Sequence, residues 1–117
     1  MMWRILIGAE DMTTYFVTRH AGAVQWADTT ALAYDVHLTH LTNLSALGQG
    51  DVVIGTLPIN MVYMLNQRGV RYIHLSLEIP PELRGVELDA DQLVACKASL
   101  QEFVVSQVES SLYVAKT

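Results

Sequence analysis

The sequence of 117 residues contains one cysteine, seven basic side chains and no long hydrophobic run. Because Cys96 stands alone, the chain forms no intrachain disulfide, and nothing in it points to an oxidising compartment. An amphipathic helix is predicted around this residue, which favours a buried, inert thiol over a reactive one. No apolar segment is long enough for a transmembrane helix or a normal signal peptide, so we expect a soluble, cytoplasmic protein.

Basic side chains are also few: seven Lys and Arg stand against twelve Asp and Glu, and the net charge is −5. Generic binding to duplex DNA or long RNA needs many cations that neutralise phosphates, so this composition argues against it. A small anionic ligand in one local pocket remains compatible with it. The sequence lacks a GxGxxG motif, a P-loop lysine and a Gly-x-Ser-x-Gly elbow, so it signals neither dinucleotide nor ATP binding.

Hydrophobic residues, by contrast, make up 51% of the chain, which is ample for one core. The length indicates one domain, and we assign residues 12–117 to it. Because so small a domain buries limited surface, further burial through self-association is expected. Residues 1–11 precede Met12, a second possible start, and are either an N-terminal extension or an extra edge strand.

Strand and helix patterns alternate along the chain. Strands are predicted at 13–19, 34–41, 50–57 and 70–79, where residues are β-branched, alternating or almost all apolar. Helices are predicted at 22–32, at 56–68 and from Asp89 to about Val104, with one short helical turn at 43–47. The tail at 110–117 is either a frayed end or a short added strand.

Capping residues mark the ends of two of these helices. Thr56 is the predicted N-cap of the second helix, with Pro58 in its first turn and Gly69 in the left-handed position beyond its end. Asp89 and Gln92 have the spacing of a capping box for the final helix. The second helix is predicted to bury a stripe formed by Met61, Met64 and Leu65. A cofactor site lined by these methionines is the less favoured alternative.

This order of elements predicts an α/β fold, a small three-layer Rossmann-like domain with a mainly parallel sheet of about four strands. We expect the strand order 2-1-3-4. In such sheets ligands bind beyond the carboxyl ends of the strands, where the strand order reverses. The ends of the first and third strands should therefore meet at one site.

The residues at these strand ends form a predicted site for an anion such as a phosphate. Two helix N-termini should supply free N–H groups and a partial positive charge there. Arg19 and Arg84 would add forked contacts, and Gly22 and Gly55 would let a ligand approach the backbone. The candidate binding or catalytic residues are Thr18, Arg19, His20, Gly22, Gly55, Thr56, Ser76 and Arg84.

Each candidate also has a structural alternative. Arg19 could serve as a salt-bridge partner, His20 as a capping histidine, and His74 as a hydrogen-bonded core residue. His37 and His40 lie three residues apart in a predicted strand and so on opposite faces, which argues against a metal site. An acidic patch is formed by Glu78, Glu82, Glu87, Asp89 and Asp91. We interpret it as a solvated loop with a helix cap rather than as paired catalytic carboxylates.

Four segments, in fixed order, carry a resemblance to a known family. They are YFVTRHAGAVQWA, GDVVIGTLP, RYIHLSL and PPELRGVEL. Together they resemble a small family of CRISPR-associated (Csx-type) accessory proteins of type III systems, whose members resemble the ring nucleases of antiviral defence. Ring nucleases bind and linearise cyclic oligoadenylate messengers, chiefly the four-membered ring. The resemblance extends from about Met12 to Leu93 and departs from the family pattern at Ala21, where proline is usual.

The resemblance implies a CARF-like fold and a nuclease that needs no metal or other cofactor. The ribose 2′-OH would attack the adjacent phosphate of cyclic tetra-adenylate and leave a linear product with a 2′,3′-cyclic phosphate. We expect Arg19 and the amides near Gly22 to hold that phosphate and His20 to move a proton, with a homodimer binding the ring at or near its interface. The alternatives are a non-catalytic sponge or sensor of the same messenger and an adaptor that docks an effector. The positions that match the family motifs are Arg19, His20, Thr56, Ser76 and Arg84.

Overall fold

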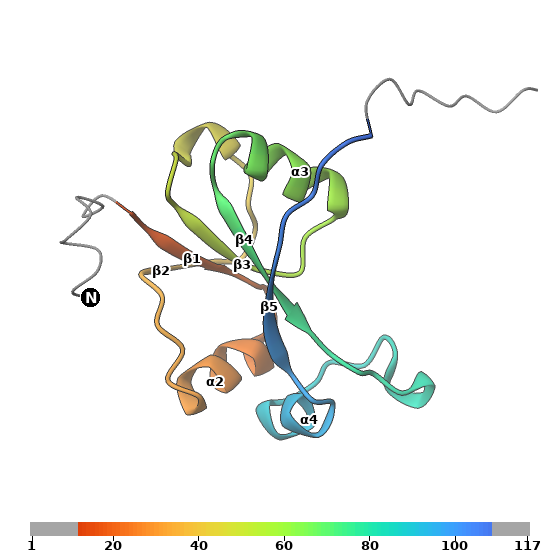
Figure 1. Cartoon of the computed structure of the whole chain (residues 1–117). Coiled ribbons are helices and arrows are strands. Elements are labelled where there is room, and N and C mark those ends of the chain that lie inside the picture. The colour runs from red at the N-terminus through yellow and green to blue at the C-terminus, as the bar shows by residue number, and fades with distance from the viewer. Residues whose placement is uncertain (1–11, 109–117) are drawn as a thin grey trace, which may run out of the picture.

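Five strands form one sheet in the order β2-β1-β3-β4-β5 in the computed structural model, which describes residues 12–108. They are β1 (Thr14–Val17), β2 (Val36–Leu38), β3 (Val52–Gly55), β4 (Arg71–Ser76) and β5 (Ser99–Phe103). The first four strands run parallel, and β5 pairs antiparallel with β4 (Figure 1). The predicted Rossmann-like α/β class and the order 2-1-3-4 of the first four strands are confirmed, although each of those strands is shorter than predicted.

Helices cover both faces of this sheet. They are α2 (Ala21–Thr29), α3 (Ile59–Gln67) and α4 (Ala90–Ala95), with short 3₁₀ turns at η1 (Leu44–Ala46) and η2 (Pro81–Leu83). Figure 1 shows α3 on one face and both α2 and α4 on the other, which gives the three predicted layers. Among the described residues, no helix has the length and apolar character required to cross a membrane.

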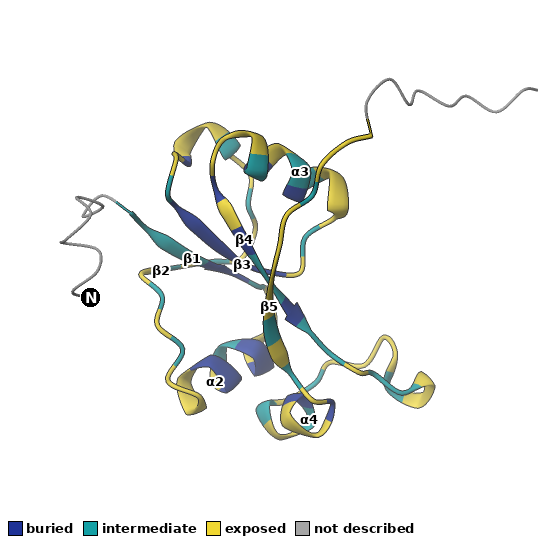
Figure 2. Cartoon of the chain, in the orientation of Figure 1, coloured by how far each residue is buried: buried dark blue, intermediate teal, exposed yellow. Residues whose placement is uncertain are grey.

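Two hydrophobic clusters fill the spaces between the layers (Figure 2). Phe16 and Trp26 belong to the cluster beneath α2 and α4, while Val53 and Leu65 belong to the cluster beneath α3. All four residues of β3 are buried, which explains its almost continuous apolar sequence. Since complete burial of a large apolar side chain stabilises a fold by roughly 1.5–3 kcal/mol, these clusters hold the helices against the two faces of the sheet.

The prediction of a long final helix from Asp89 to about Val104 is wrong, and the second half of that segment forms a fifth strand. α4 ends at Ala95, the buried Cys96 is its C-cap, and Lys97 adopts a φ of 59° that turns the chain back. The following residues pair with β4 from Ser76↔Ser99 to Tyr72↔Phe103. The apolar spacing in this segment suited a helix, but strand pairing satisfies the backbone groups that β4 would otherwise leave exposed.

The start of α3 also differs from the prediction. The helix begins at Ile59 with Pro58 as its N-cap residue, so Thr56 lies in the loop after β3 and caps nothing. Met64 is 48% exposed, and Val62 takes its predicted place on the buried face at 2% exposure. The reason is geometric, because Val62 packs beside Leu65 one helical turn away and both face the sheet.

Three other helix ends were predicted. α2 ends at Thr29, before the predicted Leu32, because the chain turns at Ala31 with a φ of 55°. Gly69 has a φ of 79°, and Asp89 forms the capping box with Gln92, so both of these predictions are confirmed. The predicted extension at residues 1–11 and the tail at 110–117 lie outside the described residues.

Candidate functional site

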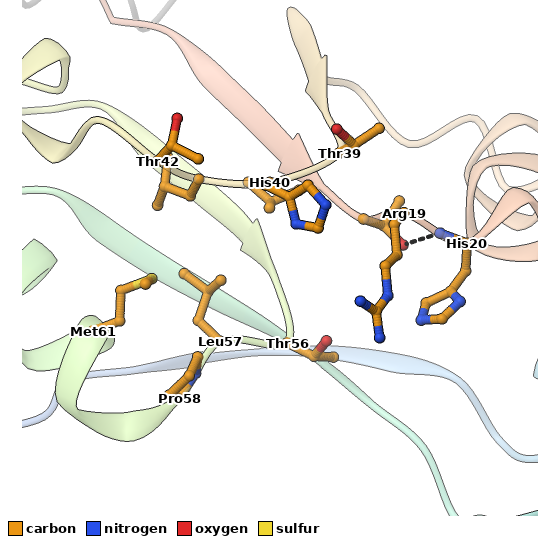
Figure 3. A pocket seen from close by; sticks show the side chains of 12 residues that line it. Arg19, His20, Thr39, His40, Thr42, Thr56, Leu57, Pro58 and Met61 are labelled. Atoms are coloured by element: carbon orange, nitrogen blue, oxygen red, sulfur yellow. Dashed lines mark hydrogen bonds between the residues drawn. The ribbon is translucent and has the colours of Figure 1, made fainter. Parts of the chain in front are cut away.

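A cleft of about 430 Å³ lies at the carboxyl ends of β1, β2 and β3 (Figure 3). Each of these parallel strands contributes the residues that directly follow it, as expected for the edge where the strand order reverses. Met61 of α3 closes one side of the cleft. The lining residues from the strand ends are Val17, Thr18, Arg19, His20, Thr39, His40, Leu41, Thr42, Thr56, Leu57 and Pro58.

Arg19 supplies a cation to this cleft. Its side chain is exposed, and within residues 12–108 its guanidinium makes no hydrogen bond or ion pair. Figure 3 shows the guanidinium pointing towards Thr56, beside the ring of His20. The first-turn N–H groups of α2, at Ala21 and Gly22, also have no backbone partner in the described part of the chain. A phosphate in the cleft would therefore meet a free cation and a helix N-terminus.

His20 is held by a carboxylate from a distant loop. Its Nδ1 lies 2.7 Å from Glu87 Oε2 and 2.9 Å from Oε1, and its backbone N–H donates to Thr18 Oγ1 at 3.1 Å. A carboxylate accepts but does not donate, so Nδ1 carries the hydrogen of the neutral imidazole and Nε2 keeps a free lone pair. Both side chains are more than half exposed, and such a pair stabilises the fold by at most about 1 kcal/mol. Its main consequence is the orientation of the ring.

A second, mainly apolar pocket of about 250 Å³ adjoins the cleft. The two share Thr18, His20 and Thr56, so they meet at a polar wall. The remaining walls are apolar and come from α2, β4, the loop that follows β4, and α4. These residues are Ala23, Leu75, Leu77, Ile79, Val86, Leu88 and Leu93. A ligand with a polar backbone and a flat apolar group would find a matching surface for each part.

The loop between β3 and α3 forms one cleft wall and is held from beneath by Tyr72. The buried phenol of Tyr72 donates to Gly55 O at 3.0 Å and accepts from Leu57 N at 2.9 Å. Its oxygen also lies 2.7 Å from His74 Nδ1, and the prediction that His74 is hydrogen-bonded is confirmed. Burial raises the pKa of Tyr72 above the usual 10.0, partly offset by the Leu57 N–H, so the phenol stays protonated at neutral pH.

Of the predicted site residues, the structure brings Thr18, Arg19, His20 and Thr56 together in the cleft. The two glycines have a different role from the one predicted. A side chain at Gly22 would lie 1.8 Å from Leu88 O, and one at Gly55 would lie 2.8 Å from Val17 O. The protein's own backbone occupies the space that we expected a ligand to use, so tight packing explains both glycines.

Ser76 and Arg84 are not among the lining residues of the cleft. Ser76 donates to Gln101 Oε1 at 2.9 Å and so links β4 to β5. Arg84 is exposed in the loop before α4, next to Gly85, which lines a hollow together with Arg19, His20 and Glu87. The loop that carries Arg84 therefore borders the same edge of the sheet.

The structure also places the acidic residue Glu87 and the two histidines His37 and His40. Glu87 is 63% exposed, as expected for a solvated loop, and it also contacts His20, since the loop before α4 folds back over the end of β1. His40 lines the cleft, whereas His37 Nε2 lies 2.8 Å from Thr18 O. Among the described residues, no three His, Cys, Asp or Glu side chains are grouped as metal ligands. His40 lies at the carboxyl end of the second predicted strand, so the position of ligand sites beyond strand ends is the signal that points to it.

Comparison with known proteins places the chain in a family. Residues 15–106 match the family model described as "Putative CRISPR-associated protein (Cas_VVA1548)". The match includes all five strands from Tyr15 onwards, and with them the lining of the cleft. No curated protein and no solved structure shows a match to the chain. The chain thus belongs to this family of CRISPR-associated proteins.

Proposed function

We propose that the protein is a ring nuclease that binds a cyclic oligoadenylate, chiefly cyclic tetra-adenylate, opens the ring and so switches off type III CRISPR signalling. One observation carries the proposal. Arg19, with an unpaired guanidinium, and His20, held by a carboxylate, line one cleft, and the helix α2 begins at the next residue, Ala21. Membership of a CRISPR-associated family supports it, as does the resemblance to ring nucleases.

Each part of a nucleotide has a counterpart in the cleft. The phosphate lies against Arg19 and the free amides of Ala21 and Gly22, where charge-assisted hydrogen bonds are strong. The base enters the apolar pocket, and the ribose lies between them beside His20 and Thr56. This division explains how a chain with a net charge of −5 binds a polyanion, since only the local potential at the cleft needs to be positive.

The reaction is an internal transesterification. The ribose 2′-oxygen bonds to the adjacent phosphorus, and the bond from phosphorus to the 5′-oxygen of the next nucleotide breaks. His20 Nε2 accepts the proton of the 2′-OH, and the departing 5′-oxygen takes a proton from water. The product is a linear oligoadenylate with a 2′,3′-cyclic phosphate and a 5′-hydroxyl.

The protein accelerates this reaction through proton transfer and charge stabilisation. A positioned general base contributes typically about 10²–10⁴-fold, and a donor aimed at the developing charge about 10²–10³-fold. Glu87 keeps the basic Nε2 of His20 available by holding Nδ1. Arg19 is the donor that stabilises the additional negative charge on the phosphorane oxygens.

A two-fold homodimer completes the proposed site. Cyclic tetra-adenylate is rotationally symmetric, so two copies of the cleft related by a two-fold axis can hold it with the same residues used twice. The ring would lie at or near the interface between the two protomers. Titration of the ring should therefore saturate at one ring for two chains.

The direct test is incubation of excess labelled cyclic tetra-adenylate with the full chain in EDTA, followed by chromatography of the products. Repeated conversion to linear products with a 2′,3′-cyclic phosphate is the expected result. Cleavage that needs an added divalent cation would contradict the metal-free mechanism. Tight binding with an intact ring would identify a sponge or sensor, and no binding would favour an adaptor. Parallel reactions with three- and six-membered rings would define the preferred ring size.

A further inference from the structure

One hydroxyl group ties the two ends of the short segment that carries Thr56. Tyr72 Oη donates to the carbonyl oxygen of Gly55 at 3.0 Å and accepts from the N–H of Leu57 at 2.9 Å. These backbone groups lie on either side of Thr56, which lines both the cleft and the apolar pocket. The path of the backbone at Thr56 therefore depends on a side chain of the neighbouring strand β4.

The hydrogen-bond inventory of this hydroxyl links the tautomer of His74 to the acceptor that receives the phenol hydrogen. A phenol has one hydrogen to donate and two lone pairs to accept with. If the hydrogen goes to Gly55 O, the remaining contacts, from Leu57 N–H and His74 Nδ1, must both be donors. His74 must then carry a hydrogen on Nδ1. The opposite tautomer would draw the phenol hydrogen to His74 and leave the Gly55 carbonyl without this donor.

The other restraints on the loop do not replace the hydroxyl. Gly55 packs closely against β1, since a side chain there would lie 2.8 Å from Val17 O. In the described part of the chain, however, Tyr72 has the only side chain that forms a hydrogen bond with the backbone of Gly55 or Leu57. The Tyr72 ring itself is 2% exposed and packs in the cluster beneath α3. Ring packing and hydroxyl bonding can therefore be separated by removing the oxygen alone.

We propose that Tyr72 is a positioning residue, whose hydroxyl, with His74 as a donor on Nδ1, holds the loop from Gly55 to Leu57 in the shape that the cleft requires. The inference about the reaction rests on the proposed function, whereas the inference about the loop does not. Tyr72 touches no substrate, because it lies beneath the loop and is absent from the lining of the cleft. It acts through Thr56 and the entry to α3.

The test compares Tyr72→Phe with Tyr34→Phe in the full chain. Tyr34 is a matched control, since its ring is partly buried against Phe16 and its hydroxyl makes no hydrogen bond in the described part of the chain. In Tyr72→Phe, amide hydrogen exchange at Leu57 should become at least about tenfold faster. Cleavage of cyclic tetra-adenylate should slow by about 10- to 100-fold in kcat with a smaller change in KM, because displaced groups lose alignment for the reaction. Tyr34→Phe should change neither.

A second measurement uses the unmodified protein. The ¹⁵N chemical shifts of the His74 ring report which nitrogen carries the hydrogen, and hydrogen on Nδ1 is the expected result. A neutral ring with hydrogen only on Nε2 would overturn the bonding scheme, even if Tyr72→Phe failed to fold. Unchanged exchange at Leu57 in Tyr72→Phe would also overturn the proposal, and so would faster exchange with undiminished kcat. If the unmodified protein cleaves no ring, the proposed function fails, and exchange at Leu57 together with the His74 shifts still decides the inference about the loop.

Discussion

The two ends of the parallel sheet differ in how their arginine side chains are paired and in whether a carboxylate is buried. At the amino end, the buried Asp51 accepts hydrogen bonds from the N–H groups of Thr13 and Gly48, each at 2.9 Å. Asp35 accepts from the N–H of Thr14 at 2.8 Å. These carboxylates join the start of β1 to the starts of its two neighbours, β2 and β3.

The amino end also contains a paired arginine, Arg71 of β4. Its Nε and Nη2 donate to the two carboxylate oxygens of Glu102 on β5, at 2.9 and 2.8 Å. This contact raises the pKa of Arg71 and lowers that of Glu102. At the carboxyl end, Arg19 has no such partner within residues 12–108.

The difference shows where the chain uses charge for its own stability and where it leaves charge available. Paired groups at the amino end satisfy backbone donors and join strands, so their loss should weaken folding. Arg19 and the ring of His20 contribute little to packing because they are exposed. Substitutions at the carboxyl end should therefore affect binding and turnover of the ligand, whereas substitutions at the amino end should affect the free energy of unfolding.

The largest effect is expected for His20→Ala. Loss of a general base should lower turnover of cyclic tetra-adenylate by about 10²–10⁴-fold. The free energy of unfolding should change by no more than about 1 kcal/mol, because the side chain is half exposed and its pair with Glu87 is exposed too. Single-turnover cleavage and urea unfolding measure the two quantities. Glu87→Gln, which keeps the shape but removes the charge, should show a smaller loss of turnover, and full activity of His20→Ala would remove its proton-transfer role.

Arg19→Ala should have the next largest effect and should act mainly on binding. Loss of a charge-assisted contact to phosphate costs roughly 1.5–3 kcal/mol, which corresponds to about a 10- to 150-fold weaker affinity. Arg19→Lys should recover part of it, because lysine keeps the charge but lacks the planar fork. Equilibrium binding of labelled ring to each variant gives the affinities. Unchanged affinity in Arg19→Ala would mean that the phosphate lies elsewhere.

Asp51→Ala tests the amino end. The substitution leaves the N–H groups of Thr13 and Gly48 without their carboxylate acceptor, and the free energy of unfolding should fall by about 1–3 kcal/mol. Turnover by the folded fraction should stay the same, because the cleft lies at the opposite end of the sheet. Urea unfolding and an assay at low temperature measure these outcomes. A loss of turnover without a loss of stability in Asp51→Ala would contradict the claim that the amino end contributes to stability and not to the site.

Glu102→Gln should have the smallest effect, below about 1 kcal/mol at neutral pH, because the pair with Arg71 is largely exposed. The pKa of Glu102 is lowered in the folded state, so its stabilising contribution is present above the usual value of 4.5. It is lost as pH falls below 4.5 through the folded-state pKa. The stability difference between the unmodified protein and Glu102→Gln should therefore shrink in that range. A stability difference that grows on acidification would contradict the lowered pKa of Glu102.

The cleft was predictable where its residues follow strands directly. Thr18, Arg19 and His20 come after β1 and Thr56 comes after β3, and parallel strands place their carboxyl ends at one edge. Glu87 was not predictable, because it lies 67 residues from His20 and its loop has no periodic pattern. The role of Gly22 was not predictable either. Only glycine fits at this position because Leu88 O lies where a side chain would be, and Leu88 is distant in the sequence.

The amino-acid sequence by itself determined the alternation of strands and helices, the Rossmann-like class and the end signals at Gly69 and Asp89. These features are local, since periodicity and capping act over a few neighbouring residues. The tertiary structure alone decided that Ser99–Phe103 is a strand and that His20 faces Glu87. It also decided that the hydroxyl of Tyr72 holds the loop beside Thr56. Such contacts join segments far apart in the chain, and they exist only once the layers have packed.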